Sequence, residues 1–221
     1  MIQQLAQRGY GYGSGTLDPL GQKFLINIPK NASSYLLDWS SKHGWTAAHA
    51  DQPNNNITEL IVVLRDPLER WVSGVAQYLT SYVLNVTGAY STETGPGPDD
   101  QQMSAHQFIQ YYNPVVERLL FDQCNRLDDH VWPQHEFFEN LLITVPRKYF
   151  FIDADFNNQI SQYLKFRPIE NLDANLGNSN IDTHKIQQFI KSRLNSRPDL
   201  EQRVRKAYDQ DYNLIKQVFN T

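Results

Sequence analysis

The stretch KFLINIPKNASSYLLDW, from Lys23 to Trp39, decides the fold class of this chain. An apolar run ends at a proline and a lysine, small polar residues follow, and an apolar pattern then resumes at helical spacing. This order predicts a strand, a tight loop and a helix. A helix start offers unpaired N–H groups and the positive end of its dipole, so the loop is suited to a phosphate-like anion. The glycine-rich nucleotide loop that ends in Lys-Ser/Thr is absent from it.

The bulk composition is that of an ordinary globular protein. The 221 residues are 40% hydrophobic and 20% charged, carry a formal net charge of −4 and include one cysteine. This charge gives no reason to expect a nucleic-acid partner. No apolar run approaches the roughly 20 residues that span a membrane, and one cysteine cannot form an internal disulfide or a cysteine-based metal cluster. We therefore predict a soluble, cytoplasmic protein without a membrane partner.

Strands and helices alternate along the chain. Residues 1–22, rich in Gly, Tyr and Gln, are expected to form an irregular N-terminal arm, followed by a single α/β domain over residues 23–221. The predicted strands cover residues 23–28, 44–50, 59–64 and 148–153. The predicted helices cover residues 33–42, 67–83, 104–112 and 115–127, with further helices from Phe156 onward. The alternation predicts a central parallel sheet flanked by helices.

The stretch VVLRDPLERWVSG, from Val62 to Gly74, is the second informative segment. Its DPLE portion is explained by helix initiation, because aspartate is a good N-cap and proline suits the first helical position. Arg65 and Ser73 are not explained in this way. Arg65 follows the carboxyl end of a buried strand, where open α/β sheets bind ligands, and arginine binds phosphate through two parallel hydrogen bonds. The segment therefore predicts a second anion site.

Taken together, the two stretches resemble the nucleotide motifs of the sulfotransferase family. IPKNASSYL is similar to the family's 5′-phosphosulfate loop, and LRDPLERWVSG to its 3′-phosphate motif. DDHVWPQ (128–134) and VRKAYDQDYNLI (204–215) are similar to the carbohydrate-type branch. The resemblance runs from about Lys23 to near the C-terminus. It implies a P-loop-like three-layer fold and transfer of a sulfuryl group from 3′-phosphoadenosine-5′-phosphosulfate to an acceptor hydroxyl or amine.

The resemblance also implies roles for individual residues around this donor. Lys30 would be catalytic and contact the leaving oxygen between phosphate and sulfate. Arg65 and Ser73 would hold the 3′ phosphate. The residues that would wrap the 5′ phosphate are Asn31, Ala32, Ser33 and Ser34. Asn31 and Ala32 stand where many relatives have Gly or Thr. No metal is required by these roles.

Transfer to a hydroxyl also needs a base that takes the proton. His49 ends a predicted strand at the same sheet edge as Lys30 and Arg65, and its pKa range suits the task, so we predict that it is this base. A satisfied polar residue at a strand end is the alternative interpretation. His130, Asp51 and Glu59 are the substitutes.

The acceptor side is assigned by the DDHVWPQ segment, where the resemblance places His130 and Gln134 near the site. The alternative is a helix-start segment that packs Trp132 and Phe137. The expected partner is a small molecule or a carbohydrate, and loops such as 88–102 would set which one. The polar connector of residues 170–180 is a candidate loop over the nucleotide.

Two other functions stay open. A nucleotide kinase could use the same fold, although the Gly-Lys-Ser/Thr loop and a clear Mg²⁺-binding acid after a strand are missing. A non-catalytic module that binds a nucleotide or a sulfated sugar is the second. One basic cluster is also ambiguous, since it could contact the nucleotide or form a solvated helix face: Arg197, Arg203, Arg205 and Lys206.

Overall fold

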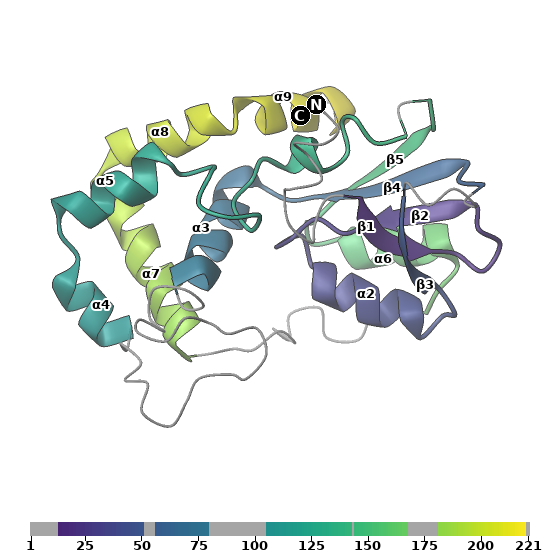
Figure 1. Ribbon diagram of the computed structural model, residues 1–221, viewed down its shortest axis with the longest axis horizontal. Coiled ribbons are helices and arrows are strands. Elements are labelled where there is room, and N and C mark those ends of the chain that lie inside the picture. Colours follow the sequence, from purple (N-terminus) through teal and green to yellow (C-terminus); the bar gives the residue numbers. More distant parts are fainter. Residues whose placement is uncertain (1–12, 51–55, 80–104, 143, 168–180, 220–221) are drawn as a thin grey trace. The chain divides into compact units, whose positions relative to one another are not determined.

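In the computed structural model, the chain divides into two compact units (Figure 1). The structure describes residues 13–50, 56–79, 105–142, 144–167 and 181–219. The first unit comprises Met1–Pro67, Pro133–Asn178 and Asp209–Thr221. The second comprises Leu68–Trp132 and Ser179–Tyr208. Among the described residues, no helix has the length and apolar character needed to cross a membrane.

The first unit is built on a five-stranded sheet with the strand order β3-β1-β2-β4-β5. The strands are β1 (Ser14–Leu17), β2 (Lys23–Ile26), β3 (Thr46–His49), β4 (Glu59–Leu64) and β5 (Arg147–Phe151). β2, β4 and β5 are mutually parallel, as the alternating pattern predicts. β1 is antiparallel to both β2 and β3, so the sheet is mixed, and the prediction of a wholly parallel sheet is corrected.

The mixed character comes from β1, which lies inside the segment expected to be an irregular arm. A Cβ atom added at Gly15 would lie 2.2 Å from the carbonyl oxygen of Leu25, so the two strands approach where only glycine fits. Thr16 is buried, and its hydroxyl accepts a hydrogen bond from Ser40 at 3.1 Å. The strand depends on a small residue and a hydroxyl rather than on an apolar run, which is why composition concealed it.

Helices cover both faces of this sheet. α2 (Ser33–Ser41) and α6 (Phe156–Leu164) pack on one face. Phe151, the neighbour of inward-facing Phe150 on β5, contacts Phe219 of α9 (Asp209–Phe219) with ring centroids 5.8 Å apart. The buried residues of the α2 and α6 face are Leu25, Leu36, Trp39, Trp45, Ile61, Val63, Phe150, Phe156, Ile160 and Leu164.

The described part of the second unit is helical. Its helices are α3 (Pro67–Tyr78, which begins at the last residue of the first unit), α4 (Ala105–Tyr111), α5 (Pro114–Asp122), α7 (Ile181–Ser196) and α8 (Pro198–Ala207). α3 begins at Pro67, as predicted, whereas α5 ends at Asp122 instead of Leu127. Just beyond this end, the Cys124 carbonyl accepts a hydrogen bond from the Trp71 indole at 2.8 Å. Residues 80–83, 88–102 and 170–180, for which a helix end and two loops are predicted, lie outside the described residues.

Candidate anion-binding site

The loop between β2 and α2 has a strained backbone. Lys30 has φ 67 and Ala32 has φ 57, whereas Asn31 between them has no positive φ. The left-handed conformation costs a non-glycine residue roughly 1–2 kcal/mol. Strain of this kind persists where the surrounding structure enforces it, and it is concentrated at functional sites. Alternating hands of the backbone also turn successive N–H groups into one concavity, which is a known way to bind anions.

The start of α2 adds further donors to this loop. Ala32 is its N-cap residue and makes no side-chain capping bond, and the first turn carries no acidic residue. The first N–H groups of a helix have no partner within the helix, and they lie at the positive end of its dipole. Ser33 is half-buried and Ser34 is exposed, so the two predicted hydroxyl ligands stand in this first turn. The segment offers backbone and hydroxyl donors without a competing carboxylate.

Asn31 fixes the loop to the sheet. Its side chain is buried, and its Nδ2 donates to the Val63 carbonyl at 2.8 Å and to Gln134 Oε1 at 2.6 Å. These two acceptors determine the orientation of the amide. The Oδ1 atom is also buried, and it accepts no hydrogen bond from any residue that the structure describes. Asn31 is therefore an anchor beneath the loop, which explains an amide at this position.

Gln134, at the start of the 3₁₀ helix η2 (Gln134–Phe137), joins the loop to the end of β4. Its Oε1 accepts from Asn31 and from the Arg65 N–H at 2.9 Å, and its Nε2 donates to the Arg65 carbonyl at 2.9 Å. The residue is completely buried, with 0% exposure. Gln134 thus lies buried beneath the two strand-end loops, where it contacts Asn31 and Arg65. Its predicted place on the acceptor side stays a prediction.

The structure brings Lys30 and Arg65 together. The Arg65 Nη1 donates to the Lys30 carbonyl at 3.2 Å. The sequence offered no partner for this guanidinium, because the contact joins segments that are 35 positions apart. Arg65 is half-buried, and the Gln134 amide bonds to both its backbone N–H and its carbonyl. The two predicted anion-binding stretches therefore meet at one sheet edge, where the Arg65 side chain contacts the Lys30 backbone.

His49 lies at the same edge but farther along it. β3 runs in the direction of β2 and β4, because β1 is antiparallel to both β2 and β3. β1 separates β3 from β2, which places the two strands about 10 Å apart. The His49 ring packs against Gly13, where an added Cβ would lie 2.7 Å from Cε1. The role of His49 as the base stays a prediction.

Glu59 and Asp51 are the carboxylates predicted as substitutes for His49 as the base. Glu59 is the first residue of β4, at the opposite end of the strand from Arg65, and it pairs with Lys23 at 3.5 Å. Six strand residues separate the two ends by roughly 20 Å, so Glu59 is removed as a base for a ligand near Arg65. Asp51 lies outside the described residues.

Ser73 and His130 belong to the second unit, so the prediction that Ser73 joins Arg65 at one phosphate stays a prediction. Ser73 is half-buried on α3, directly before Gly74. A Cβ added at Gly74 would lie 2.4 Å from the carbonyl oxygen of His130, so the segment around His130 rests on the helix. Buried Arg70 holds the same segment through the Trp132 carbonyl at 2.5 Å.

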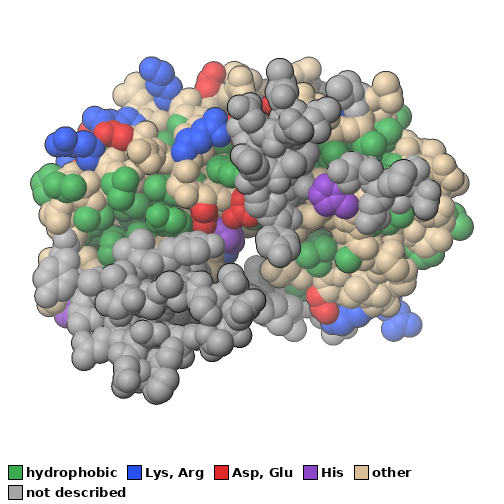
Figure 2. Space-filling model, in the orientation of Figure 1, with side chains coloured by type: hydrophobic (Ala, Val, Ile, Leu, Met, Phe, Trp, Pro, Cys, Tyr) green, Lys and Arg blue, Asp and Glu red, His purple; other side chains and the backbone are tan. Residues whose placement is uncertain are grey.

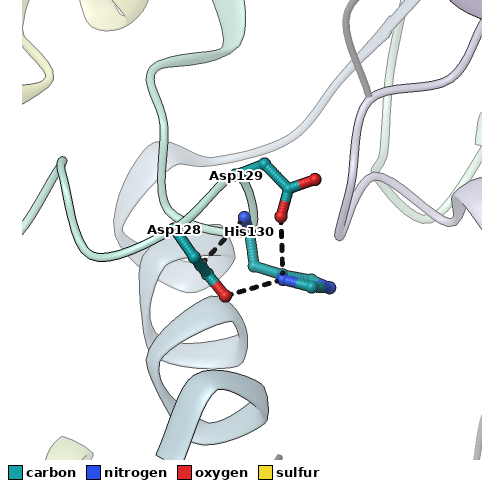
Figure 3. A group of neighbouring side chains, drawn as sticks. All are labelled: Asp128, Asp129 and His130. Atoms are coloured by element: carbon teal, nitrogen blue, oxygen red, sulfur yellow. Dashed lines mark hydrogen bonds and ion pairs between the residues drawn. The ribbon is translucent and has the colours of Figure 1, made fainter. Parts of the chain in front are cut away.

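Asp128, Asp129 and His130 form a compact charged cluster (Figure 3). His130 Nδ1 lies 3.0 Å from Asp128 Oδ2 and 3.2 Å from Asp129 Oδ1. Burial lowers the pKa of His130, but the hydrogen bonds and charges of the two aspartates outweigh it and raise the pKa to about 9. His130 is therefore an imidazolium at neutral pH and a donor rather than a base. The three side chains could ligate a metal ion only if Nδ1 first lost its proton.

The ambiguous basic cluster on α8 is a paired surface. Arg203 lies 2.8 Å from Asp122, Arg205 lies 2.7 Å from Glu201, and Arg197 lies 2.8 Å from Asp199. Basic and acidic side chains are mixed over α5 and α8 in the space-filling view (Figure 2). For these three arginines the solvated-face interpretation fits better, since each already has a carboxylate partner.

Gly74 and Asp211 have no predicted role, although both lie within the motifs quoted above. Gly74 ends the second motif, and its need for glycine comes from a backbone 56 positions away in sequence, at His130. Asp211 lies in the closing VRKAYDQDYNLI motif and is buried. A buried carboxylate needs hydrogen-bond partners, so its burial would have marked Asp211 as important. The sequence pattern of α9 does not show that this one polar position is buried.

No protein-family model, curated protein sequence or solved structure matches the chain significantly. The similarity to sulfotransferases therefore rests on the motifs of the sequence. The contact between the Arg65 guanidinium and the Lys30 carbonyl is a separate observation, which does not depend on that similarity.

Proposed function

We propose that the protein is a sulfotransferase with a P-loop-like loop at Lys30. It would move a sulfuryl group from 3′-phosphoadenosine-5′-phosphosulfate to an acceptor hydroxyl, for which a carbohydrate is one candidate. The observation that carries the proposal is the alternating left-handed backbone at Lys30 and Ala32, which leads into a helix start without a side-chain cap. A loop that stores strain and gathers N–H donors suits an anionic ligand.

The donor has two separated anionic groups, and two cationic residues, Lys30 and Arg65, follow the ends of the adjacent parallel strands β2 and β4. Lys30 and the loop amides would hold the 5′ phosphosulfate, and Arg65 would hold the 3′ phosphate. The contact between the Arg65 guanidinium and the Lys30 carbonyl, at 3.2 Å, keeps the two positions in a fixed relation. Arginine suits this task because its guanidinium binds phosphate oxygens through two parallel hydrogen bonds.

The transfer itself forms one bond and breaks one. The acceptor oxygen bonds to sulfur, the bond between sulfur and the bridging phosphate oxygen breaks, and the acceptor proton passes to a base. Negative charge develops on the leaving phosphate, where Lys30 and the N–H groups of the loop would stabilise it. His49 remains the proposed base. His130 is less suited, because its raised pKa keeps it protonated at neutral pH.

A thermal-shift titration separates the proposal from its two rivals. Adenosine 3′,5′-bisphosphate at about 100 times its dissociation constant should raise the melting temperature by roughly 5 °C or more. ATP with Mg²⁺ should raise it much less. The reverse order would favour a nucleotide kinase, and no shift with either ligand would sink the proposal.

Turnover then separates an enzyme from a binding module. The donor, labelled on its sulfate, would be incubated with a panel of hydroxyl acceptors that includes neutral and acidic sugars. Labelled product that depends on Lys30 would support a sulfotransferase. Bisphosphate binding without transfer to any acceptor would favour the non-catalytic module.

A further inference from the structure

Asp211 of α9 is a buried carboxylate with three hydrogen-bond donors. Its side chain is 1% exposed. Its Oδ2 accepts from the Gln134 N–H at 2.7 Å, and its Oδ1 accepts from the His135 N–H at 2.9 Å and from His135 Nδ1 at 2.7 Å. A carboxylate only accepts, so His135 Nδ1 carries the hydrogen in this pair. Asp211 therefore supplies a cap to η2 from another helix.

This cap is needed because η2 cannot cap itself. Its N-cap residue is Pro133, which makes no side-chain capping bond. The first N–H groups of such a helix need acceptors when they are buried. Asp211 satisfies two of them and thereby fixes where η2 begins. It also neutralises its own buried charge with these donors and with His135, which gives the carboxylate a reason to be buried.

The beginning of η2 determines the position of the Gln134 amide. That amide holds Asn31 at 2.6 Å and both backbone groups of Arg65 at 2.9 Å. A continuous set of short hydrogen bonds thus runs from α9 to the loop with positive φ at Lys30 and Ala32. All of its members lie in the first unit.

We propose that Asp211 is a positioning residue for the anion-binding loop. It acts through Gln134, which holds Asn31 and the Arg65 backbone in the geometry that binds the ligand. The identity of that ligand rests on the proposed function, whereas the positioning of the loop does not. Asp211 itself contacts no reacting group in this assignment.

The test compares Asp211→Asn with Asp209→Asn in the full chain. Both variants remove one negative charge from the first turn of α9. Asp209 is exposed and is hydrogen-bonded only within its own helix in the described contacts, to Asn213 at 3.1 Å. Asn at position 211 would direct an NH₂ group at a backbone N–H or at His135, so one of the three bonds would be lost. The measurements are amide hydrogen exchange by mass spectrometry and calorimetric titration with adenosine 3′,5′-bisphosphate.

Asp211→Asn should accelerate exchange about tenfold in peptides that contain residues 29–36 and 62–67 and leave the α6 peptide unchanged. The dissociation constant of the bisphosphate should rise about tenfold. Asp209→Asn should match the wild type in both. Equal acceleration in α6 would show a general structural role and overturn the inference. Unchanged loop exchange, or faster loop exchange with unchanged affinity, would overturn it as well.

Two further outcomes are distinguishable. If the wild type does not bind the bisphosphate, the proposed function fails, while the exchange data still decide whether Asp211 orders the loop. If Asp211→Asn does not fold, Gln134→Met provides the test. This variant keeps the backbone N–H groups that donate to Asp211 and removes only the side-chain amide that holds the loop. Normal loop exchange in Gln134→Met would overturn the inference.

Discussion

The loop at Lys30 and the cluster at Asp128–His130 are two segments of the described chain suited to charged ligands, and they are built in opposite ways. The loop uses the backbone, with positive φ at Lys30 and Ala32 and a helix start without a capping side chain. The cluster uses side chains, with two aspartates around one histidine. The N–H donors of the loop keep their partial charge at every pH. The His130 ring of the cluster, in contrast, loses its proton and its charge as the pH rises.

This difference determines what each segment requires from the rest of the chain. A strained backbone persists only when buried neighbours hold it, and here Asn31 and Gln134 do so. The cluster requires only that its own segment is seated, which Gly74 permits by having no side chain. The backbone geometry of the loop therefore depends on side chains packed beneath it. The charge pairing of the cluster comes from three consecutive residues and depends on protonation, although its segment also rests on α3.

The largest expected effect is the loss of the charge at Lys30. Lys30→Met keeps an unbranched side chain of similar length, so the loop should fold. Turnover should fall by about 10²- to 10³-fold, because one preorganised donor at the leaving group is lost. Bisphosphate affinity should stay near that of the wild type, since this donor acts mostly as charge develops.

The measurements are kcat with a working acceptor and the dissociation constant of the bisphosphate for both proteins. Near-normal turnover would remove Lys30 from the mechanism. It would also show that the loop contributes through its backbone alone, which would sharpen the contrast with the cluster.

Arg65→Ala tests whether the edge recognises a second anionic group. The variant should weaken adenosine 3′,5′-bisphosphate by roughly 1.5–3 kcal/mol, the value of a charged hydrogen bond, and adenosine 5′-phosphate by much less. Arg65→Lys is the matched control, because it keeps the charge and loses the planar fork. Calorimetry with both nucleotides measures the difference. An equal loss for the two ligands would assign Arg65 to the backbone network at Lys30 instead.

Gly74→Ala tests how the cluster is seated on α3. The new Cβ would lie 2.4 Å from a backbone oxygen that cannot rotate away, so the free energy of unfolding should fall by roughly 1–3 kcal/mol. Ser73→Ala, one position earlier, adds no atom and should change it by less than about 0.5 kcal/mol. Urea denaturation compares the two variants. Wild-type stability in Gly74→Ala would mean that the segment moves freely off the helix.

Local patterns predicted the elements on either side of the candidate site. The apolar runs at β2 and β4, the helical spacing of α2 and the proline that begins α3 are all decided by neighbouring residues. These elements also place Lys30 and Arg65 at the ends of adjacent parallel strands. The general position of the candidate site could therefore be predicted from the sequence.

The support of the site could not be predicted, because it depends on long-range contacts. Gln134 is 103 positions from Asn31, and Asp211 is 77 positions from Gln134. The DDHVWPQ motif points to Gln134, but a single polar residue does not reveal that it is completely buried. The left-handed backbone at Lys30 was equally hidden, since lysine carries no signal for positive φ. β1 was missed for a related reason, as its fit depends on the close approach at Gly15.

The pH dependence of stability distinguishes the cluster from the loop. The pKa of His130 is raised from its ordinary value of 6.5 to about 9, so its stabilisation is complete below pH 6.5 and is lost as the pH rises through 9. We expect a loss of about 1–2 kcal/mol, reduced from the full linkage value because the side chain is partly exposed. The pKa of His135 is also raised, because Asp211 outweighs the effect of burial, and it adds a loss of the same sign.

His130→Gln isolates the contribution of the cluster. The wild type and this variant should differ in the free energy of unfolding, and that difference should shrink by about 1–2 kcal/mol between pH 6.5 and pH 9.5. Urea denaturation at several pH values measures it. The ring signal of His130 should titrate near pH 9 in an NMR experiment. A midpoint near 6.5 would show that the two aspartates do not hold the proton, and the contrast with the loop would fail.

The smallest expected effect concerns the strain itself. Ala32 has φ 57 and ψ 23, a conformation that glycine adopts without the steric cost of a Cβ. Ala32→Gly should remove roughly 1–2 kcal/mol of strain and add up to about 1 kcal/mol of backbone entropy cost, so the protein should gain about 0.5–1 kcal/mol in the free energy of unfolding. Ser34→Gly, in the same helix start, relieves no strain and should destabilise by roughly 0.5–1 kcal/mol. Urea denaturation of both variants at one pH provides the comparison.

Because the N–H groups keep their directions in Ala32→Gly, bisphosphate affinity should not fall. If Ala32→Gly destabilises the protein as Ser34→Gly does, then residue 32 is not left-handed in solution, and the loop loses the backbone geometry on which the proposed anion site depends.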